Sequence, residues 1–178
     1  MHFVPLTQET VVPILRKESD EWIKQLSKEE ERAIKKYTKN SGDPKDDKFY
    51  ARLNSMLRGE YPSDSTLEYY SKLISNGLSK YELKNDIICY RALSFDAYEG
   101  FNIGEIFIEP QFVSTSVTKS KALNLPFKIT IRVPQGGRGA YIENLSKYPN
   151  QREFLIDKNV PFRVISKTND HIELEMII

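Results

Sequence analysis

The sequence predicts an α+β fold, with helices in the N-terminal half followed by antiparallel or mixed strands. Apolar residues recur at helical spacing up to about residue 85, and beyond it the apolar pattern has a period of two. Helices followed by many short strands favour α+β over a doubly wound α/β fold, in which the two types of element would alternate. The 178 residues fit one compact domain, without an internal repeat or a linker.

Four helices are expected in the first half, and their ends are marked by local signals. Ser27 followed by Glu30 is a capping-box pattern, and acidic residues follow it while lysines end the same segment. Ser65 and Glu68 repeat the pattern for the last helix, and Gly77 is expected to end it. The expected helices are residues 9–26, 27–40, 48–59 and 63–78.

The second half alternates apolar and polar residues in short segments separated by turn residues, which is typical of strands. The motif PQGGRG has the glycines of a tight turn between two strands but lacks the strand–helix context of a phosphate-binding loop. The expected strands are residues 86–93, 105–117, 127–133, 139–144, 152–157, 161–166 and 171–178.

The composition argues against several classes of function. With 26 basic and 25 acidic residues the net charge is +1, so electrostatics gives no argument for nucleic acid or membrane as the main partner. The single cysteine, Cys89, excludes an intramolecular disulfide and lies in an apolar run where burial is expected. The two histidines, His2 and His171, lie near opposite ends, which disfavours a zinc site or a Ser-His-Asp triad. Any chemistry must therefore come from Arg, Glu, Ser, Gln and Asn.

The sequence shows neither a membrane span nor a secretion signal. No stretch approaches the length of a transmembrane helix, and the start MHFVPLTQETVVPIL lacks a basic segment followed by an uninterrupted apolar core. A signal removed from the mature protein would leave no trace, so this observation does not establish an intracellular protein.

Three polar elements interrupt segments that otherwise favour apolar or β-branched residues. They are Arg91 near the end of a buried-looking run, the triplet 114–116 with sequence Ser-Thr-Ser, and Gln151 with Glu153. In an extended chain, residues two apart project to the same face, so Gln151 and Glu153 would lie side by side. Taken singly, each element also fits a plain structural role: a surface cation, a polar edge and a solvated strand start.

The order of these elements resembles that of the mono-ADP-ribosyltransferases of the Arg–Ser–Glu class, and within it the single-domain clostridial-type exoenzymes that modify Rho GTPases. The helical segment LSKEEERAIKKYTK, followed by LNSMLRG, looks like the family's helix pair. The segments YRAL, GEIFIEPQFVSTSV and PFKITIRVPQGGRGAYIENLSKYPNQREFLI follow in the family's order. The resemblance covers roughly residues 20–178. It implies helices packed on a two-sheet, mainly antiparallel core, and a single catalytic domain over residues 1–178 in which 1–20 are an extension and the start of the first helix.

The resemblance implies a site for NAD as substrate, with no metal. Glu153 would stabilise the positive charge that develops on the ribose when the nicotinamide bond breaks, and Ser114 would orient this carboxylate. Arg91 has the fork geometry that a diphosphate requires. Four further residues are expected to bind NAD: Asn54, Arg58, Thr115 and Ser116. Without the resemblance, Asn54 and Arg58 fit an ordinary solvated helix face.

The same resemblance assigns the acceptor side to Gln151, which would hydrogen-bond the nucleophilic side chain of a target protein. In the family, Gln at this position goes with an amide acceptor, so an asparagine of a Rho-type small GTPase is implied. Tyr148 matches the aromatic residue of the family's substrate-recognition turn. A partly exposed loop tyrosine is the alternative reading.

The segment VTKSKALNLP departs from the family pattern. Leu123 and Leu125 stand where an aromatic residue and a phosphate-binding arginine are expected, and Lys119 or Lys121 can supply only a point charge. We therefore expect NAD to bind more weakly than is usual in the family.

The leading hypothesis is an NAD-dependent mono-ADP-ribosyltransferase, a bacterial toxin and virulence factor that is secreted and acts in the host cytosol. Its expected partners are NAD and a host protein, without nucleic acid or membrane, and it is expected to be a monomer. The alternatives are an arginine-specific transferase or an NAD glycohydrolase using the same site, or a binding module that retains the fold without catalysis.

Overall fold

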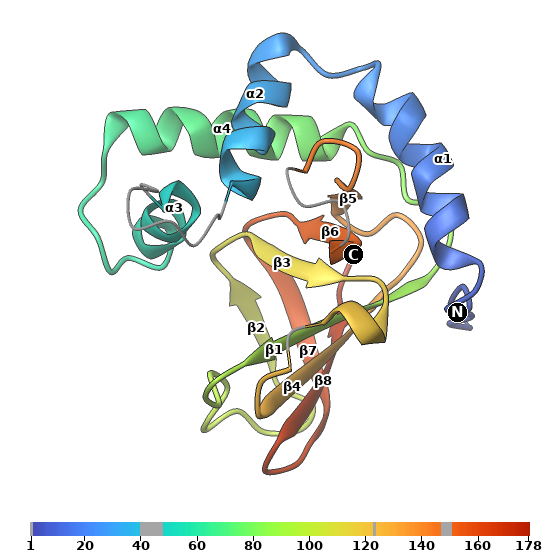
Figure 1. The fold of residues 1–178 in the computed structure, drawn as a ribbon. Helices are drawn as coiled ribbons and strands as arrows, with labels where there is room; N and C mark the ends of the chain where they lie inside the picture. Colours follow the sequence, from blue (N-terminus) through green and yellow to red (C-terminus); the bar gives the residue numbers. More distant parts are fainter. Residues whose placement is uncertain (1, 40–47, 123, 147–150) are drawn as a thin grey trace.

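The computed structural model describes residues 2–39, 48–122, 124–146 and 151–178, and it places the helices on one side of a strongly twisted sheet (Figure 1). The helices are α1 (Val11–Ile23), α2 (Lys28–Thr38), α3 (Phe49–Leu57) and α4 (Ser65–Ser79). The strands are β1 (Ile87–Leu93), β2 (Ile106–Glu109), β3 (Val113–Ser116), β4 (Phe127–Val133), β5 (Gly139–Tyr141), β6 (Glu153–Ile156), β7 (Val160–Lys167) and β8 (His171–Met176). The predicted α+β class is confirmed.

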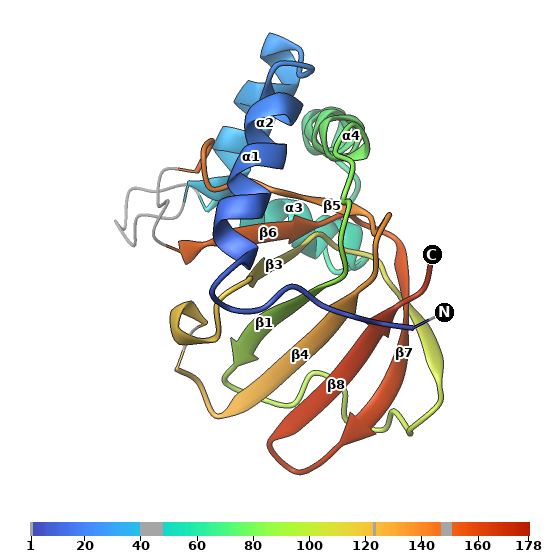
Figure 2. The ribbon, with the colours of Figure 1, turned by 90° about the vertical axis from the view of Figure 1, so that its right-hand side faces the viewer.

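The eight strands in the described part of the chain belong to one hydrogen-bonded sheet in the order β2-β7-β8-β4-β1-β3-β6-β5. Every pairing is antiparallel except that of β4 with β8. The joint between β1 and β3 has one register pair, Tyr90 with Ser116, whereas β1 and β4 pair from Ile87 to Leu93. Strands β3, β6 and β5 therefore run across the ends of the longer strands, as Figure 2 shows. The two expected sheets are present as two parts of one sheet, joined at this point.

The start of α2 and the end of α3 follow the local signals in the sequence. Ser27 Oγ accepts from the Glu30 N–H at 3.1 Å, and the Glu30 carboxylate accepts from the Ser27 N–H at 2.8 Å, so the predicted capping box is confirmed. Helix α3 ends at Leu57, and the following Gly59 has a φ of 79°, which glycine adopts without steric cost.

The predicted limits of α4 are wrong at both ends. Asp64, one residue earlier than expected, is the N-cap and accepts from the Leu67 N–H at 3.0 Å, so Ser65 lies inside the helix. Gly77 also lies inside α4. Its carbonyl accepts from Trp22 Nε1 at 2.8 Å, and a Cβ added to it would lie 3.0 Å from Ile34 Cδ1. This glycine therefore allows α1, α2 and α4 to pack closely rather than ending a helix.

The segment expected as one strand over residues 105–117 forms two strands in different parts of the sheet. Pro110, which has no N–H to donate to a ladder, lies between them. Strand β2 pairs with β7 at one edge, while β3 lies between β1 and β6. The chain therefore leaves the long strands at Pro110 and enters the crossing strands at Val113.

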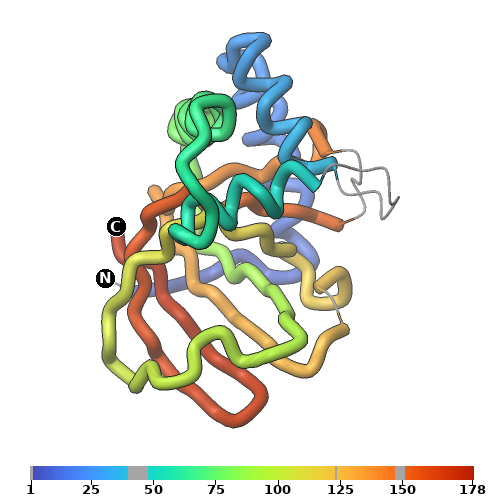
Figure 3. Tube along the Cα trace, turned by 90° about the vertical axis from the view of Figure 1, so that its left-hand side faces the viewer, coloured from blue at the N-terminus to red at the C-terminus, as the bar shows by residue number. Residues whose placement is uncertain are grey.

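The helices lie against the crossing strands (Figure 3), and buried apolar residues from the helices, the crossing strands and the long strands form one core. The buried apolar face of α1 is formed by Val11, Leu15 and Trp22. Cys89 is buried on β1 as expected, and burial raises the pKa of its thiol to about 12. None of the helices in the described part of the chain combines the length and apolarity that crossing a bilayer requires.

Candidate active site

A cavity of about 430 Å³ lies where the two parts of the sheet meet beneath α2 and α3. Its volume is within the range of small-molecule sites. Strands β1, β3 and β6 contribute to its wall, as do α2, α3 and the segment after β3. The residues expected from the sequence that line it are Asn54, Arg91, Ser114, Thr115, Ser116, Gln151 and Glu153.

Glu153 is the first residue of β6 and its carboxyl is buried in this cavity. Burial raises the pKa of Glu153 to about 7, and the opposing effects of a hydrogen bond with Ser114 and the charge of Arg91 are smaller. A carboxyl with such a pKa in a cleft is a typical signature of a functional group.

The register of β3 and β6 explains why Ser114 reaches this carboxyl. Ser116 lies opposite Glu153, and Ser114 lies one diagonal step away on the same face. The Ser116 hydroxyl is used locally, because it donates to the Thr118 carbonyl at 3.1 Å and accepts from the Thr118 N–H at 3.2 Å. Thr115 projects to the other face and donates to the Phe154 carbonyl at 2.7 Å. Of the three hydroxyls, only that of Ser114 is directed to the Glu153 carboxylate.

Arg91 connects the two parts of the sheet. It lies on β1, and its Nη1 donates to the Ser114 carbonyl at 3.1 Å. The partly buried guanidinium lines the cavity with further donors available, and its charge acts on Glu153. It is therefore placed to bind an anionic group.

Asn54 and Arg58 differ in position although they lie four residues apart. Asn54 is buried in the cavity wall, and among the described residues its Oδ1 has no hydrogen-bond partner. Arg58 is the residue after the last turn of α3 and does not line the cavity. Its guanidinium donates to Gln111 Oε1 at 2.6 Å and to Glu60 Oε2 at 3.0 Å. In this conformation Arg58 binds protein groups rather than facing the cavity.

Two tyrosines outside the set expected from the sequence, Tyr37 and Tyr50, also line the cavity. Their rings meet edge to face with centroids 6.3 Å apart. The Tyr37 hydroxyl accepts from Asn54 Nδ2 at 2.9 Å and is hydrogen-bonded with Ser114, and burial raises the pKa of Tyr37 to about 12. The spacing of Tyr50 and Asn54, four residues apart on α3, was a signal that could have identified Tyr50.

Gln151 reaches the same cavity as Glu153, but not for the reason expected from the sequence. Strand β6 begins at Glu153, and Arg152 before it has a φ of 52°, so the chain is not extended from Gln151 to Glu153. The convergence of the two side chains depends on this turn of the backbone rather than on strand alternation. Tyr148 lies outside the described residues.

The segment after β3 contributes Lys121, Ala122 and Leu125 to the cavity. Lys119–Lys121 form a short 3-10 turn, and the Lys119 N–H is held by Gln8 Oε1 at 3.0 Å. Lys121 therefore supplies a positive charge to the wall. Leu123 lies outside the described residues.

The residues present fit NAD. Arg91 and Lys121 offer positive charge for a diphosphate, and Glu153 offers a carboxylate for a ribose. Asn54 Oδ1, which has no partner among the described residues, offers an acceptor for an amide, amine or hydroxyl group. Within the described ranges, no group of three or more His, Cys, Asp or Glu residues is arranged to hold a metal ion.

Comparison with known proteins gives a family match over nearly the whole chain. A sequence model of the ADP-ribosyltransferase exoenzyme family matches residues 16–177. The chain is 32% identical over 162 residues to the NAD(+)–arginine ADP-ribosyltransferase EFV of Enterococcus faecalis, covering 84% of this chain and 31% of that protein. It is 33% identical over 138 residues to the NAD(+)–protein-arginine ADP-ribosyltransferase Tre1 of Serratia proteamaculans, covering 76% of this chain and 28% of that protein.

The aligned part of the chain thus spans less than a third of the length of each of these two relatives. Among solved structures, that of C3stau2 from S. aureus with NAD aligns with a TM-score of 0.77 at 20% identity, covering 99% of each chain. At 20% identity, the similarity to this structure shows a shared fold and nothing more.

Proposed function

The chain belongs to the ADP-ribosyltransferase exoenzyme family, whose substrate is NAD, and we propose that it cleaves the bond between nicotinamide and ribose and transfers ADP-ribose to a protein side chain. The observation that carries this proposal is the buried Glu153 carboxyl, hydrogen-bonded with Ser114 and facing the charge of Arg91 in one cavity. The match over residues 16–177 supports the same activity.

Glu153 acts on the charge that develops during cleavage. As nicotinamide leaves, positive charge builds on the ribose, and a fixed carboxylate in a site of low dielectric stabilises that charge better than water does. Ser114 donates to the carboxylate and limits its rotation, while Arg91 binds the diphosphate. The cationic nicotinamide of bound NAD lowers the pKa of Glu153, so that the carboxylate form is present when it is required.

Gln151 holds the acceptor in this proposal. Its carboxamide can donate to and accept from the amide of an asparagine side chain, so we keep an asparagine on a Rho-type small GTPase as the proposed target. The protein acts as a toxin in the cytosol of a host cell. Thr115 and Ser116 shape the wall that receives NAD, and Tyr148 contacts the protein target.

Arginine is the second candidate acceptor, because the two relatives at 32% and 33% identity are named as arginine-specific transferases. A carboxylate at position 151 would hold a guanidinium better than the carboxamide of Gln151 does, which favours the amide acceptor for this chain.

The test is to incubate the protein with isotope-labelled NAD and a eukaryotic cell lysate, and to identify the modified residue by mass spectrometry. We expect a labelled asparagine on a protein of small-GTPase size. Label on arginine would contradict the acceptor assignment and leave the transferase, whereas release of nicotinamide without protein label would indicate a glycohydrolase.

A matched variant separates the two acceptors. Gln151→Glu is expected to reduce labelling of asparagine by about tenfold or more and to favour arginine, with little effect on nicotinamide release from NAD alone. Equal loss of both activities would contradict an acceptor role for Gln151.

Ligand titration checks the expected weak binding of NAD, and a dissociation constant in the nanomolar range would contradict it.

A further inference from the structure

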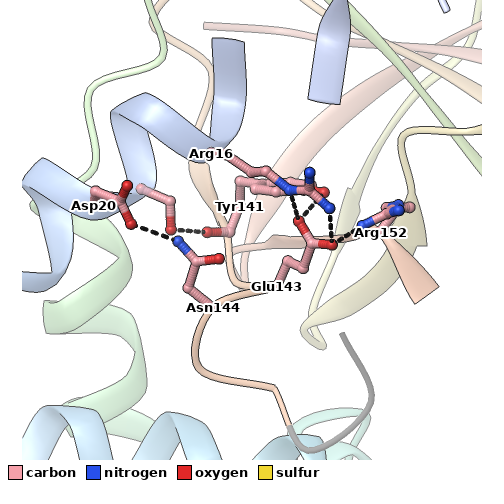
Figure 4. Close-up of polar contacts among 7 residues, drawn as sticks. Arg16, Asp20, Tyr141, Glu143, Asn144 and Arg152 are labelled. Atoms are coloured by element: carbon pink, nitrogen blue, oxygen red, sulfur yellow. Dashed lines mark hydrogen bonds and ion pairs between the residues drawn. The ribbon is translucent and has the colours of Figure 1, made fainter. Parts of the chain in front are cut away.

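Outside the cavity wall, the carboxylate of Glu143 binds three side chains, one from α1 and two from within nine residues of Glu143 in the sequence (Figure 4). Arg16 on α1 donates from Nε to Oε2 at 2.8 Å and from Nη2 to Oε1 at 2.9 Å, and the Tyr141 hydroxyl donates to Oε2 at 2.8 Å. The third partner is Arg152, through Nη1. Burial alone would raise the pKa of Glu143, but these hydrogen bonds outweigh it and lower the pKa, so the group is a stable anion.

The segment that carries Glu143 is fixed to α1 by two further contacts. Ser19 Oγ donates to the Tyr141 carbonyl at 2.7 Å, and Asn144 Nδ2 donates to Asp20 Oδ1 at 2.7 Å. These contacts fix the position of the Glu143 carboxylate, to which Arg152 binds.

Arg152 has an uncommon backbone conformation. Its φ of 52° lies in the left-handed region, which is unfavourable for a residue with a Cβ. The carbonyl of Arg152 accepts from the Val117 N–H at 3.0 Å, and its guanidinium is held by Glu143. One contact thus holds the main chain and another holds the side chain, which offsets the conformational cost.

Arg152 stands between the two residues that the proposed function uses. We propose that Glu143 and Arg152 form a clasp that keeps residue 152 in the left-handed conformation and thereby directs Gln151 into the cavity that Glu153 lines. The inference rests on the proposed function, and it makes Glu143 and Arg152 positioning residues for the acceptor.

The clasp acts more on transfer than on cleavage of NAD. Glu153 has its own supports, since it pairs with Ser116 of β3, hydrogen-bonds with Ser114 and accepts through its carbonyl from the Ile142 N–H at 3.0 Å. Gln151 precedes the strand, so its direction is set by the conformation of Arg152. Opening the clasp therefore displaces Gln151 and leaves Glu153 in place.

The test compares two rates in Arg152→Ala and Glu143→Gln: ADP-ribose transfer to the protein acceptor, and nicotinamide release from NAD alone. Transfer is expected to fall by about tenfold or more in each variant, because small displacements of a positioning group have effects of this size. Nicotinamide release is expected to change little. The double variant should lose no more than either single variant, since both remove one interaction.

Arg138→Ala is the matched control. Arg138 also pairs with a buried carboxylate, that of Asp157, at 3.6 Å, but at the far end of β6. In Arg138→Ala the ratio of transfer to nicotinamide release should equal that of the wild type. Arg152→Lys should recover part of the transfer rate that Arg152→Ala loses, because a lysine retains the charge. A fall of transfer and release in equal proportion in the clasp variants, as in a merely structural role, would overturn the clasp. A wild-type protein that releases no nicotinamide would instead overturn the proposed function.

A crystal structure of Arg152→Ala gives a readout that does not depend on activity. Residue 152 is expected to leave the left-handed region and Gln151 to leave the cavity, with Glu153 unchanged. An unchanged φ at residue 152 with Gln151 still in the cavity would overturn the inference.

Discussion

At the scale of one residue, Glu153 is a buried group whose ionised form lowers the stability of the fold. The residue is 7% exposed, and its pKa of about 7 means that ionising the carboxyl inside the protein costs free energy. Ser114 and Arg91 offset only part of this cost. In the proposed reaction, the positive charge that develops on the substrate would stabilise the carboxylate further and offset the remainder.

The raised pKa of Glu153 predicts a pH dependence of the reaction. In the proposed reaction the carboxylate is the active form, so kcat/KM should increase as pH rises through about 7 in the free enzyme. The corresponding rise in kcat should lie at lower pH, because bound NAD brings positive charge near the carboxyl. Measuring both parameters from pH 5 to 9 checks this, and a kcat/KM that is flat between pH 6 and 8 would contradict the assignment.

The same group predicts a pH dependence of stability. A carboxyl whose pKa is raised from 4.5 to about 7 on folding stabilises the fold below pH 4.5, and this contribution is lost as pH rises through 7. Glu153→Gln should therefore increase the free energy of unfolding at pH 8 by about 3 kcal/mol and have little effect at pH 4. Urea unfolding at the two pH values measures this difference, and a variant less stable than wild type at pH 8 would be evidence against it.

At the scale of elements, α2 begins at a capping box that the sequence predicts and ends at the wall of the cavity. The helix begins at the Ser27 capping box and carries Tyr37 near its end, where the hydroxyl meets Asn54 of α3. The acidic first turn and basic last turn also complement the helix dipole. The start of α2 is thus set by local chemistry, and its end contributes to the site.

Ser27→Ala should lower the free energy of unfolding by about 1 kcal/mol, because the Glu30 N–H loses its acceptor at the helix start. The cap is remote from the cavity wall, so NAD cleavage at 25 °C should be unchanged. Chemical denaturation with a parallel activity assay measures both effects. A large loss of activity without loss of stability would contradict the purely structural role of Ser27.

The elements differ in how far the sequence could predict them. The helices and strands follow from the change of period near residue 85 and from caps such as Ser27. The end of α4 could not be predicted, because Gly77 serves contacts with Trp22 and Ile34 that only the tertiary structure reveals. The identities of Glu153 and Ser114 could be anticipated from their motifs, whereas the clasp at Arg152 could not, since its partner Glu143 looks like an ordinary strand-end residue.

At the scale of the whole molecule, the site depends on the joint between the two parts of the sheet. Arg91 comes from the long strands, while Ser114 and Glu153 come from the crossing strands, and Asn54 comes from the helices above. Because β1 and β3 share one register pair, the joint leaves room for the cavity between the two parts. The fold therefore brings together side chains that lie far apart in the sequence.

The measurement that tests this account most directly is nicotinamide release from NAD by the wild-type protein and by Glu153→Gln, with NAD affinity determined for both. We predict that kcat falls by about 100-fold or more in the variant, because a charge-stabilising group is removed, while NAD affinity changes less than about threefold. Equal rates for the two folded proteins would contradict the central claim that Glu153 carries the chemistry of this site.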